Sequence, residues 1–259
     1  MARDRACGVP DWTDAEAYAP LLQIERAGFA WEWLRRDPLY KIAALRALDR
    51  GKVDPRFEDG RALAWNLHAF EDPGLPVPQA RPIWSAQAHP WVVAATAERS
   101  VADVDAIDLT RLEHVARLVR SPGGERLLLS DGLRSIRLDL RGDSVRDSPV
   151  RLSYELAGIG SLERPLIVLR RLRSLAAAGR FVASLHRPFK RGSRLIQLLR
   201  AHDAIEAGAR QIDIAEMLLR KGLERSRWRV HSPSIRSRAQ RLASAAKQMA
   251  GSRFWALLD

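Results

Sequence analysis

The residues whose types and spacing are best suited to chemistry lie between positions 232 and 247. Ile235, Ala239 and Leu242 recur at the spacing of one helix face, which predicts that they pack inward. The polar positions around them are expected to point outward: Ser234, Arg236, Ser237, Arg238, Gln240, Arg241 and Lys247. Arginine binds guanine or phosphate, glutamine binds adenine and serine binds phosphate, so this face is suited to DNA in the major groove. A solvated amphipathic helix in a bundle is the alternative interpretation.

Further candidate DNA-contacting residues precede this helix: Arg210, Gln211, Arg227, Arg229 and Ser232. The arginines on either side of Trp228 are expected to follow phosphates. Trp228 itself is interpreted as a packing anchor, with base stacking as the alternative. The arginine run at 170–173 is interpreted as a solvated helix face.

No comparable set of residues is suited to catalysis or metal binding. The six histidines are scattered, without a second His, Cys or Glu at ligand spacing, and Cys7 is the only cysteine. Neither a zinc site nor a disulfide within the chain is therefore expected. His202, on a leucine-striped helix, is expected to be partly buried. No Gly-x-Ser-x-Gly elbow or phosphate-binding glycine loop occurs, so we predict a protein that is not an enzyme and has no cofactor.

Positive charge is concentrated in the C-terminal part of the 259-residue chain. Residues 151–259 hold 22 Lys and Arg against 8 Asp and Glu, a net charge of +14. Residues 1–150 hold 21 against 23, a net charge of −2. A GC-rich genome raises arginine everywhere but does not remove acidic residues from one part. The asymmetry indicates a polyanionic partner, with double-stranded DNA favoured over another acidic partner.

The sequence contains no signal for a membrane or for secretion. No run of about 18 apolar residues occurs, and the first twelve residues lack the apolar stretch of a secretion signal. Together with the single cysteine, this predicts a cytoplasmic protein with no membrane partner.

Hydrophobic periodicity predicts an α+β fold in three parts. Residues 8–72 are expected to form a small helical domain, and residues 73–160 a proline-rich connection and a small antiparallel sheet. Residues 161–259 are expected to form a basic helical bundle that binds DNA even when isolated. Within the sheet, the pair Asp131-Gly132 is expected to turn a hairpin between two alternating strands.

The helices of this bundle follow the order of a helix-turn-helix. A helix over 195–206 ends in a turn at Gly208, a short helix covers 210–219, and a long helix covers 234–250. The small side chain of Ala215 is expected where the short helix crosses the long one. The connection between these two helices is longer than the three or four residues of the simplest motif.

Large aromatic residues gather in the N-terminal part: Trp12, Phe29, Trp31, Trp33 and Tyr40. The favoured interpretation is the core of a small helical domain, because large rings bury much apolar area. A surface for a protein partner is the alternative, since aromatic residues are also enriched at interfaces.

The sequence resembles a two-part proteobacterial family of transcriptional-regulator-like proteins. Pro10-Asp11-Trp12 and the segment from Gly28 to Tyr40 match the pattern of its N-terminal, regulator-like domain. The C-terminal part resembles a domain of unknown function that is described as similar to a regulator of type VI secretion activity. The residues that carry this second resemblance are 198–204, 208–209, 212–218, 228 and 235–238. Phe254-Trp255 and Arg220-Lys221-Gly222 depart from the pattern.

This resemblance implies DNA-binding control of transcription, in some cases within integrative mobile elements, by activators or by antagonists that bind activators. Two hypotheses follow. The first is a DNA-binding transcriptional regulator that uses the C-terminal helix-turn-helix. The second is an antiactivator that binds another regulator instead of DNA. RNA polymerase is a further candidate partner, and the sequence does not predict the operator, the oligomeric state or the sign of regulation.

Overall fold

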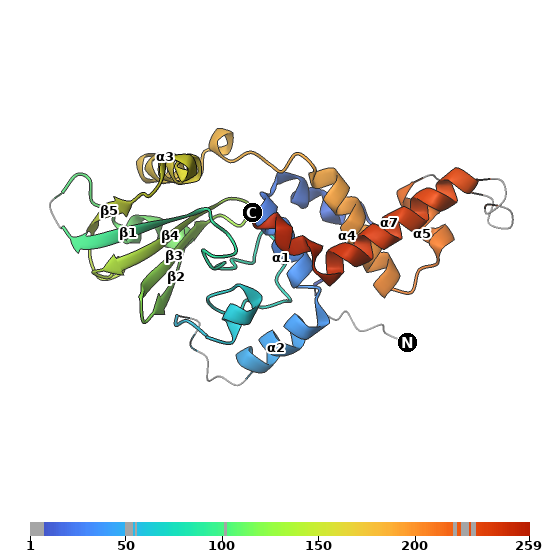
Figure 1. Cartoon of the computed structure of the whole chain (residues 1–259), viewed down its shortest axis with the longest axis horizontal. Coiled ribbons are helices and arrows are strands. Elements are labelled where there is room, and N and C mark those ends of the chain that lie inside the picture. The colour runs from blue at the N-terminus through green and yellow to red at the C-terminus, as the bar shows by residue number, and fades with distance from the viewer. Residues whose placement is uncertain are drawn as a thin grey trace.

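The computed structural model describes residues 8–49, 54, 56–100, 103–219, 222–223, 228 and 232–259. The described chain is elongated, with a five-stranded sheet at one end and helices α5 and α7 at the other (Figure 1). Helices precede and follow the central sheet, which confirms the predicted class of mixed helices and strands.

The N-terminal part contains a 3-10 helix and two α-helices: η1 (Glu16–Gln23), α1 (Arg26–Leu34) and α2 (Pro38–Leu48). Asp37 separates α1 from α2, because its carboxylate accepts the main-chain N–H groups of Leu39 and Tyr40 and caps α2. Pro38 fits the first position of α2, where a helix needs no main-chain donor.

The central sheet has the strand order β2-β3-β4-β1-β5. Its strands are β1 (Val92–Arg99), β2 (Ala116–Ser121), β3 (Gly124–Ser130), β4 (Ser135–Gly142) and β5 (Val150–Glu155). Strands β3 and β4 form the predicted hairpin, and Gly132 in its turn has a φ of 90°, which favours glycine.

One strand pair departs from the predicted antiparallel sheet. β1 lies parallel to β4, with Val93 opposite Leu138, whereas the other three pairs are antiparallel. Alternation of polar and apolar residues specifies the two faces of a strand but not its neighbours. The sequence pattern therefore predicted four of the five strands but not β2, and it missed the crossover that brings β1 beside β4.

Helix α3 (Glu163–Ala178) covers one face of the sheet, and its buried residues Val168, Leu172 and Leu175 join the buried side chains of the strands. It ends at Gly179, whose φ of 65° lies in the left-handed region that glycine adopts at many helix ends. The opposite face of the sheet carries a smaller apolar cluster: Ala69, Ile83, Val119 and Leu128.

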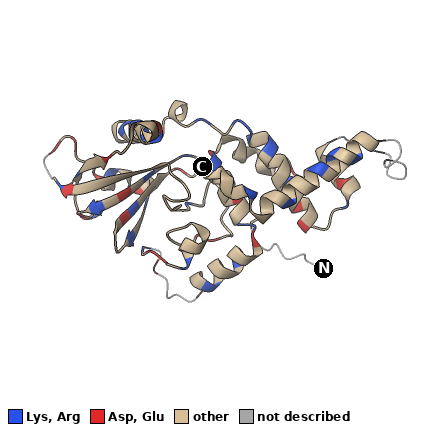
Figure 2. Ribbon diagram, in the orientation of Figure 1, with Lys and Arg blue, Asp and Glu red and all other residues tan. Residues whose placement is uncertain are grey.

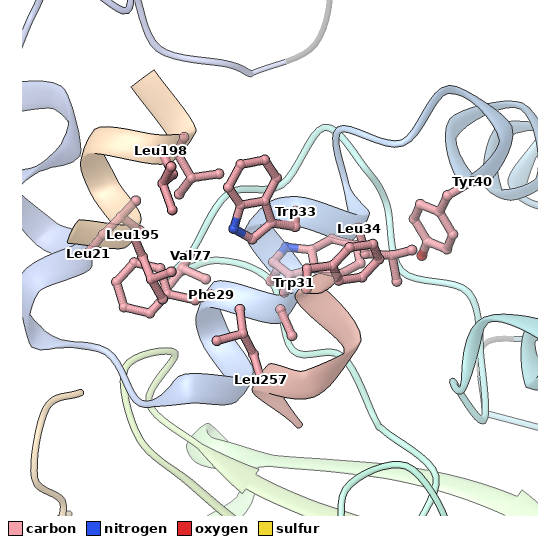
Figure 3. Close-up of a cluster of buried hydrophobic side chains, with 14 of the residues drawn as sticks. Leu21, Phe29, Trp31, Trp33, Leu34, Tyr40, Val77, Leu195, Leu198 and Leu257 are labelled. Carbon is pink, nitrogen blue, oxygen red and sulfur yellow. The ribbon is translucent and has the colours of Figure 1, made fainter. Parts of the chain in front are cut away.

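The C-terminal part also contains α4 (Gly192–Glu206), α5 (Gln211–Leu218), α7 (Pro233–Gly251) and the 3-10 helix η6 (Arg253–Leu257). They share one apolar core with α1 and α2. Figure 3 shows Trp31 and Trp33 of α1 close to Leu195 and Leu198 of α4 and to Leu257 of η6. Helices from both ends of the chain therefore depend on the same core.

The aromatic residues of the N-terminal part lie mainly in this core. Phe29, Trp31, Trp33 and Tyr40 are each at most 1% exposed, which confirms the core interpretation for these four. Trp12 is partly exposed and packs at the edge of the core.

Packing groups the elements by contact, so α3 belongs with the sheet, whereas α4 to η6 belong with the N-terminal helices. The sequence boundaries 8–72, 73–160 and 161–259 stay a prediction.

Candidate nucleic-acid interface

Helix α7 has one apolar face and one polar face, as its residue spacing predicts. Pro233 fits its first turn, and alanine, the strongest helix former, is frequent in its interior. Four residues spaced three or four apart are at most 7% exposed: Ile235, Ala239, Leu242 and Ala246. Because an α-helix turns once in about 3.6 residues, the opposite positions are directed toward solvent.

Helix α5 packs on α7 with small side chains at the contact. Ala215 and Ala239 are both 0% exposed and share an apolar cluster with Ile212, Ile235 and Trp228. Trp228 is 5% exposed, which confirms its predicted role as a packing anchor. The cluster holds α5 behind α7 and leaves the polar face of α7 uncovered.

The polar face of α7 carries four exposed cations that form no ion pair among the described residues: Arg236, Arg238, Arg241 and Lys247. Helix α7 contains no acidic residue, and Figure 2 shows basic positions recurring along it. The Arg241 guanidinium donates to the Ser237 hydroxyl at 3.0 Å, which orients this side chain along the helix. A row of cations without acidic partners creates the positive potential that attracts phosphates.

Helical spacing divides the polar face of α7 into two flanks and a ridge. Arg236, Gln240 and Lys247 share one flank, while Ser234, Arg238 and Arg241 share the other. The ridge between these flanks consists of Ser237, Ser244 and Gln248. Of the ridge residues only Ser237 was predicted, although the spacing of seven from Ser237 to Ser244 continues the same face.

A surface hollow of about 530 Å³ lies beside α7 and is lined by Gln211, Gln240, Ala243, Ser244, Lys247 and Gln248. It brings together three of the predicted residues, Gln211 of α5 with Gln240 and Lys247 of α7. Amide, hydroxyl and ammonium groups of this kind bind base edges and phosphate oxygens. The flank with Gln240 and Lys247 is therefore the side of α7 that adjoins the start of α5.

Two of the other predicted residues lie outside this face. Arg210 precedes α5, where its Nε atom is 3.3 Å from Asp213 Oδ2 and its main-chain N–H donates to the same carboxylate at 3.0 Å. The charge of Arg210 is therefore partly neutralised. Ser232 directly precedes α7 but makes no side-chain capping hydrogen bond. Arg227 and Arg229 fall outside the described residues.

A buried ionic network holds α4 against α1. Because α5 and α7 pack on α4, the network also helps to position these two helices. Arg36 donates to Asp203 from Nε at 2.8 Å and from Nη2 at 2.9 Å, the paired geometry that arginine forms with carboxylates. Glu32 accepts from Arg36 at 2.5 Å, and the Tyr18 hydroxyl donates to Asp203 at 2.6 Å. All four side chains are at most 7% exposed.

The network favours its own protonation states. Burial disfavours the charge of Arg36, but Asp203 and Glu32 outweigh burial and raise the pKa of Arg36. Burial and the neighbouring Asp203 raise the pKa of Tyr18, which keeps the hydroxyl protonated as a donor. At neutral pH Arg36 therefore stays charged and Tyr18 stays protonated, so both keep the hydrogen bonds that they donate to Asp203.

His202 is a further titratable residue of α4 whose environment is set by burial. It lies in α4 with its ring 5.5 Å from the Trp33 ring, and burial lowers its pKa. It is half-buried, as predicted. Among the described residues, no three His, Cys, Asp or Glu side chains are grouped so that they could hold a metal ion. In the same part of the chain, no helix combines the length and the apolar character that a membrane span requires.

Comparison with known families gives two matches. Residues 160–259 match the family described as "T6SS, Transcription factor, DNA binding domain". Residues 11–68 match the family described as "Proteobacterial transcriptional regulator-like domain". The two-part resemblance found in the sequence is thereby confirmed. No curated protein and no solved structure matches the chain.

Proposed function

We propose that this protein is a transcriptional regulator that binds double-stranded DNA through α7, with α5 and α7 as the two helices of a helix-turn-helix. The polar face of α7 is the observation that carries the proposal. It presents four exposed cations that form no ion pair with any residue the structure describes, opposite a buried apolar stripe. It also lies in the segment that matches a transcription-factor DNA-binding domain. Both family matches support a regulator of transcription, and the proposed location is the cytoplasm.

The order and packing of the helices support a helix-turn-helix. Gly208 follows α4 with a φ of 75°, the left-handed conformation in which glycine turns a chain sharply. The short helix α5 then packs against α7 through Ala215 and Ala239. Helix α7 has 19 residues, so it is about 28 Å long, and the major groove is about 12 Å wide and admits one helix.

The proposed contacts follow from the position of each side chain on α7. The ridge residue Ser237 and its neighbours Gln240 and Arg241 are proposed to face base edges. The outer positions are proposed to bind phosphates: Ser234, Arg236, Arg238 and Lys247. Arg210, Gln211 and Ser232 are proposed to extend the phosphate contacts beyond α7. For Arg227 and Arg229 the proposal rests on the sequence alone.

The salt dependence of binding tests this proposal. The full-length chain is titrated into a labelled duplex from the upstream region of its own operon, and anisotropy is followed at several salt concentrations. If the three α7 cations proposed to bind phosphates, Arg236, Arg238 and Lys247, each neutralise one phosphate, they contribute about −2.7 to the slope of log K against log salt. Absent binding, or affinity that does not change with salt, would contradict the proposal.

An antiactivator that binds another regulator instead of DNA is the second candidate. One observation favours it: α2 exposes Leu39 by 68%, Ile42 by 48% and Leu45 by 43%, and exposed apolar groups of this kind suit protein partners. This candidate predicts co-purification with a regulator that Leu39→Lys with Ile42→Lys abolishes. It also predicts that the chain leaves the duplex unbound.

A further inference from the structure

A pocket of about 670 Å³ lies between the sheet with α3 and the helices that share the main core. Its walls come from α3, the segment just before β1, the first residues of β4, the segment 184–191, the start of α1 and the last residues of the chain. This volume lies within the range of about 300–1,000 Å³ that is typical of small-molecule sites. None of the residues proposed to contact DNA lines the pocket.

Apolar side chains from both parts of the molecule line the pocket. Trp91 and Val168 come from the sheet and α3, while Phe189, Leu257 and Leu258 come from the side of the main core. Rings and branched side chains of this kind bind an apolar body, because contact removes it from water. The pocket is therefore suited to a ligand with an apolar part.

The charge of the pocket is strongly positive. Seven Lys and Arg residues line it against two acidic residues, Glu25 and Asp259. Glu25 is already paired, since its Oε1 atom is 2.7 Å from Arg171 Nη2. Four exposed cations of the lining form no ion pair among the described residues: Arg170, Arg187, Lys190 and Arg191.

Two helix starts add to this positive potential. Helix α1 begins at Arg26, which lines the pocket together with Ala27, and α4 begins directly after Arg191. The N-terminal end of a helix carries about half a positive charge. Uncompensated cations and two helix starts around an apolar lining are therefore complementary to an anion with an apolar body.

We propose that this pocket binds a small amphipathic organic anion, with its carboxylate, sulfonate or phosphate group at the cations and its apolar body against Trp91 and Phe189. Duplex DNA does not fit this lining. Its phosphates lie on a broad polar backbone, which would leave the apolar residues of the pocket without a contact. The bound anion contacts both the sheet with α3 and the main core. Binding therefore stabilises their relative arrangement, since a ligand that binds only the folded state raises its stability.

Binding of anilinonaphthalene sulfonate to the full-length chain tests the site, because this dye joins an apolar body to one anionic group. We expect saturable binding of one dye per chain, displaced by decanoate and not by decanol. The variant Arg187→Glu with Lys190→Glu reverses two exposed cations of the lining. We expect it to weaken dye binding about tenfold or more, as for the loss of a charge-assisted contact.

The matched control is Arg173→Glu with Arg180→Glu, which makes the same charge change at exposed residues that do not line the pocket. We expect the control to keep the dye affinity of the parent, and both variants to keep its melting temperature. Equal weakening in both variants, equal displacement by decanol, or no saturable binding would overturn the site. A loss of DNA affinity in the Arg187 and Lys190 variant alone would also overturn it, because the cations would then belong to the DNA surface. The dye titration contains no DNA, so it stands apart from the test of the proposed function.

Discussion

Replacing Ala215 by leucine tests the contact between α5 and α7. The Ala215 side chain is 0% exposed and lies in one cluster with Trp228, Ile235 and Ala239, which are themselves at most 7% exposed. Leucine adds three carbon atoms at a position where the structure leaves no access to solvent. Either α5 or the start of α7 must therefore move.

The expected cost follows from this burial. Extra methyl and methylene groups in a close-packed interior cost about 1–3 kcal/mol through shifted backbone and unfavourable rotamers. For a chain of this size, each kcal/mol lowers the melting temperature by about 2–4 °C. We expect Ala215→Leu to melt about 2–12 °C lower than the parent. Ala176→Leu, at an exposed position of α3, is the matched control and is expected to melt with the parent.

The assay combines melting with binding to the operator duplex and to a scrambled duplex. If α5 sets the orientation of α7, Ala215→Leu loses its preference for the operator, while charge-driven binding to both duplexes persists at low salt. An unchanged melting temperature together with unchanged operator preference would refute the helix-turn-helix arrangement, because leucine would then be accommodated without moving either helix.

The remaining predictions concern the stability of the shared core and of the buried ionic network between α1 and α4. Asp203→Asn weakens the paired hydrogen bonds of buried Arg36, so we expect a loss of about 3–5 kcal/mol in urea unfolding; a loss below about 1 kcal/mol would contradict a structural role for the network. A fragment of residues 160–259 exposes the side of α4 that packs on α1, so we expect the fragment to show no cooperative melting transition. The sequence, in contrast, predicted that this segment binds DNA even when isolated. A sharp melting transition of the fragment would contradict the shared core. Burial lowers the pKa of His68, His89 and His202 below the ordinary value of 6.5. The unfolded chain then binds more protons, so the stability is complete above about pH 6.5 and falls as the pH drops below it. Melting temperatures that are equal at about pH 7.5 and 5.5 would contradict this prediction.

The sequence was most informative where one element contains its own pattern. The stripe of Ile235, Ala239 and Leu242 predicted both faces of α7, because helical spacing alone determines which side chains share a face. The alternation on both sides of Gly132 predicted the hairpin of β3 and β4 for the same reason. These inferences use neighbours within a few residues and no distant contact.

The sequence pattern did not predict contacts between segments that are far apart in the chain. Glu32 and Arg36 lie in a buried network with Asp203, although charged residues are rarely buried and were not expected inside. Arg36 pairs with Asp203, which is 167 positions away in the sequence, and Glu32 pairs with Arg36, which is 4 positions away. Only the folded chain shows the pair that joins the distant segments. The parallel pairing of β1 with β4 was missed because strand alternation does not encode a neighbour.

The candidate interface was predicted in its residue types more fully than in its geometry. The list of outward polar residues omitted Ser244 and Gln248, which line the hollow with Gln211. Their relation to Gln211 depends on how α5 docks beside α7, which is a tertiary contact. The cationic pocket was missed for a similar reason, since its lining residues come from six separate segments and Arg170 was interpreted as part of a solvated face.

The central claim is that the polar face of α7 contacts DNA, and the affinities of Arg236→Ala and Arg241→Ala test it most directly. Both side chains are exposed, so both variants are expected to fold as the parent does. A lost base contact weakens operator binding by about 1–3 kcal/mol, and a lost phosphate contact lowers the salt slope by about one for every duplex. Arg173→Ala, exposed on α3, is the matched control and is expected to bind with the affinity of the parent. Parent affinity and parent salt slope in both α7 variants would contradict the account.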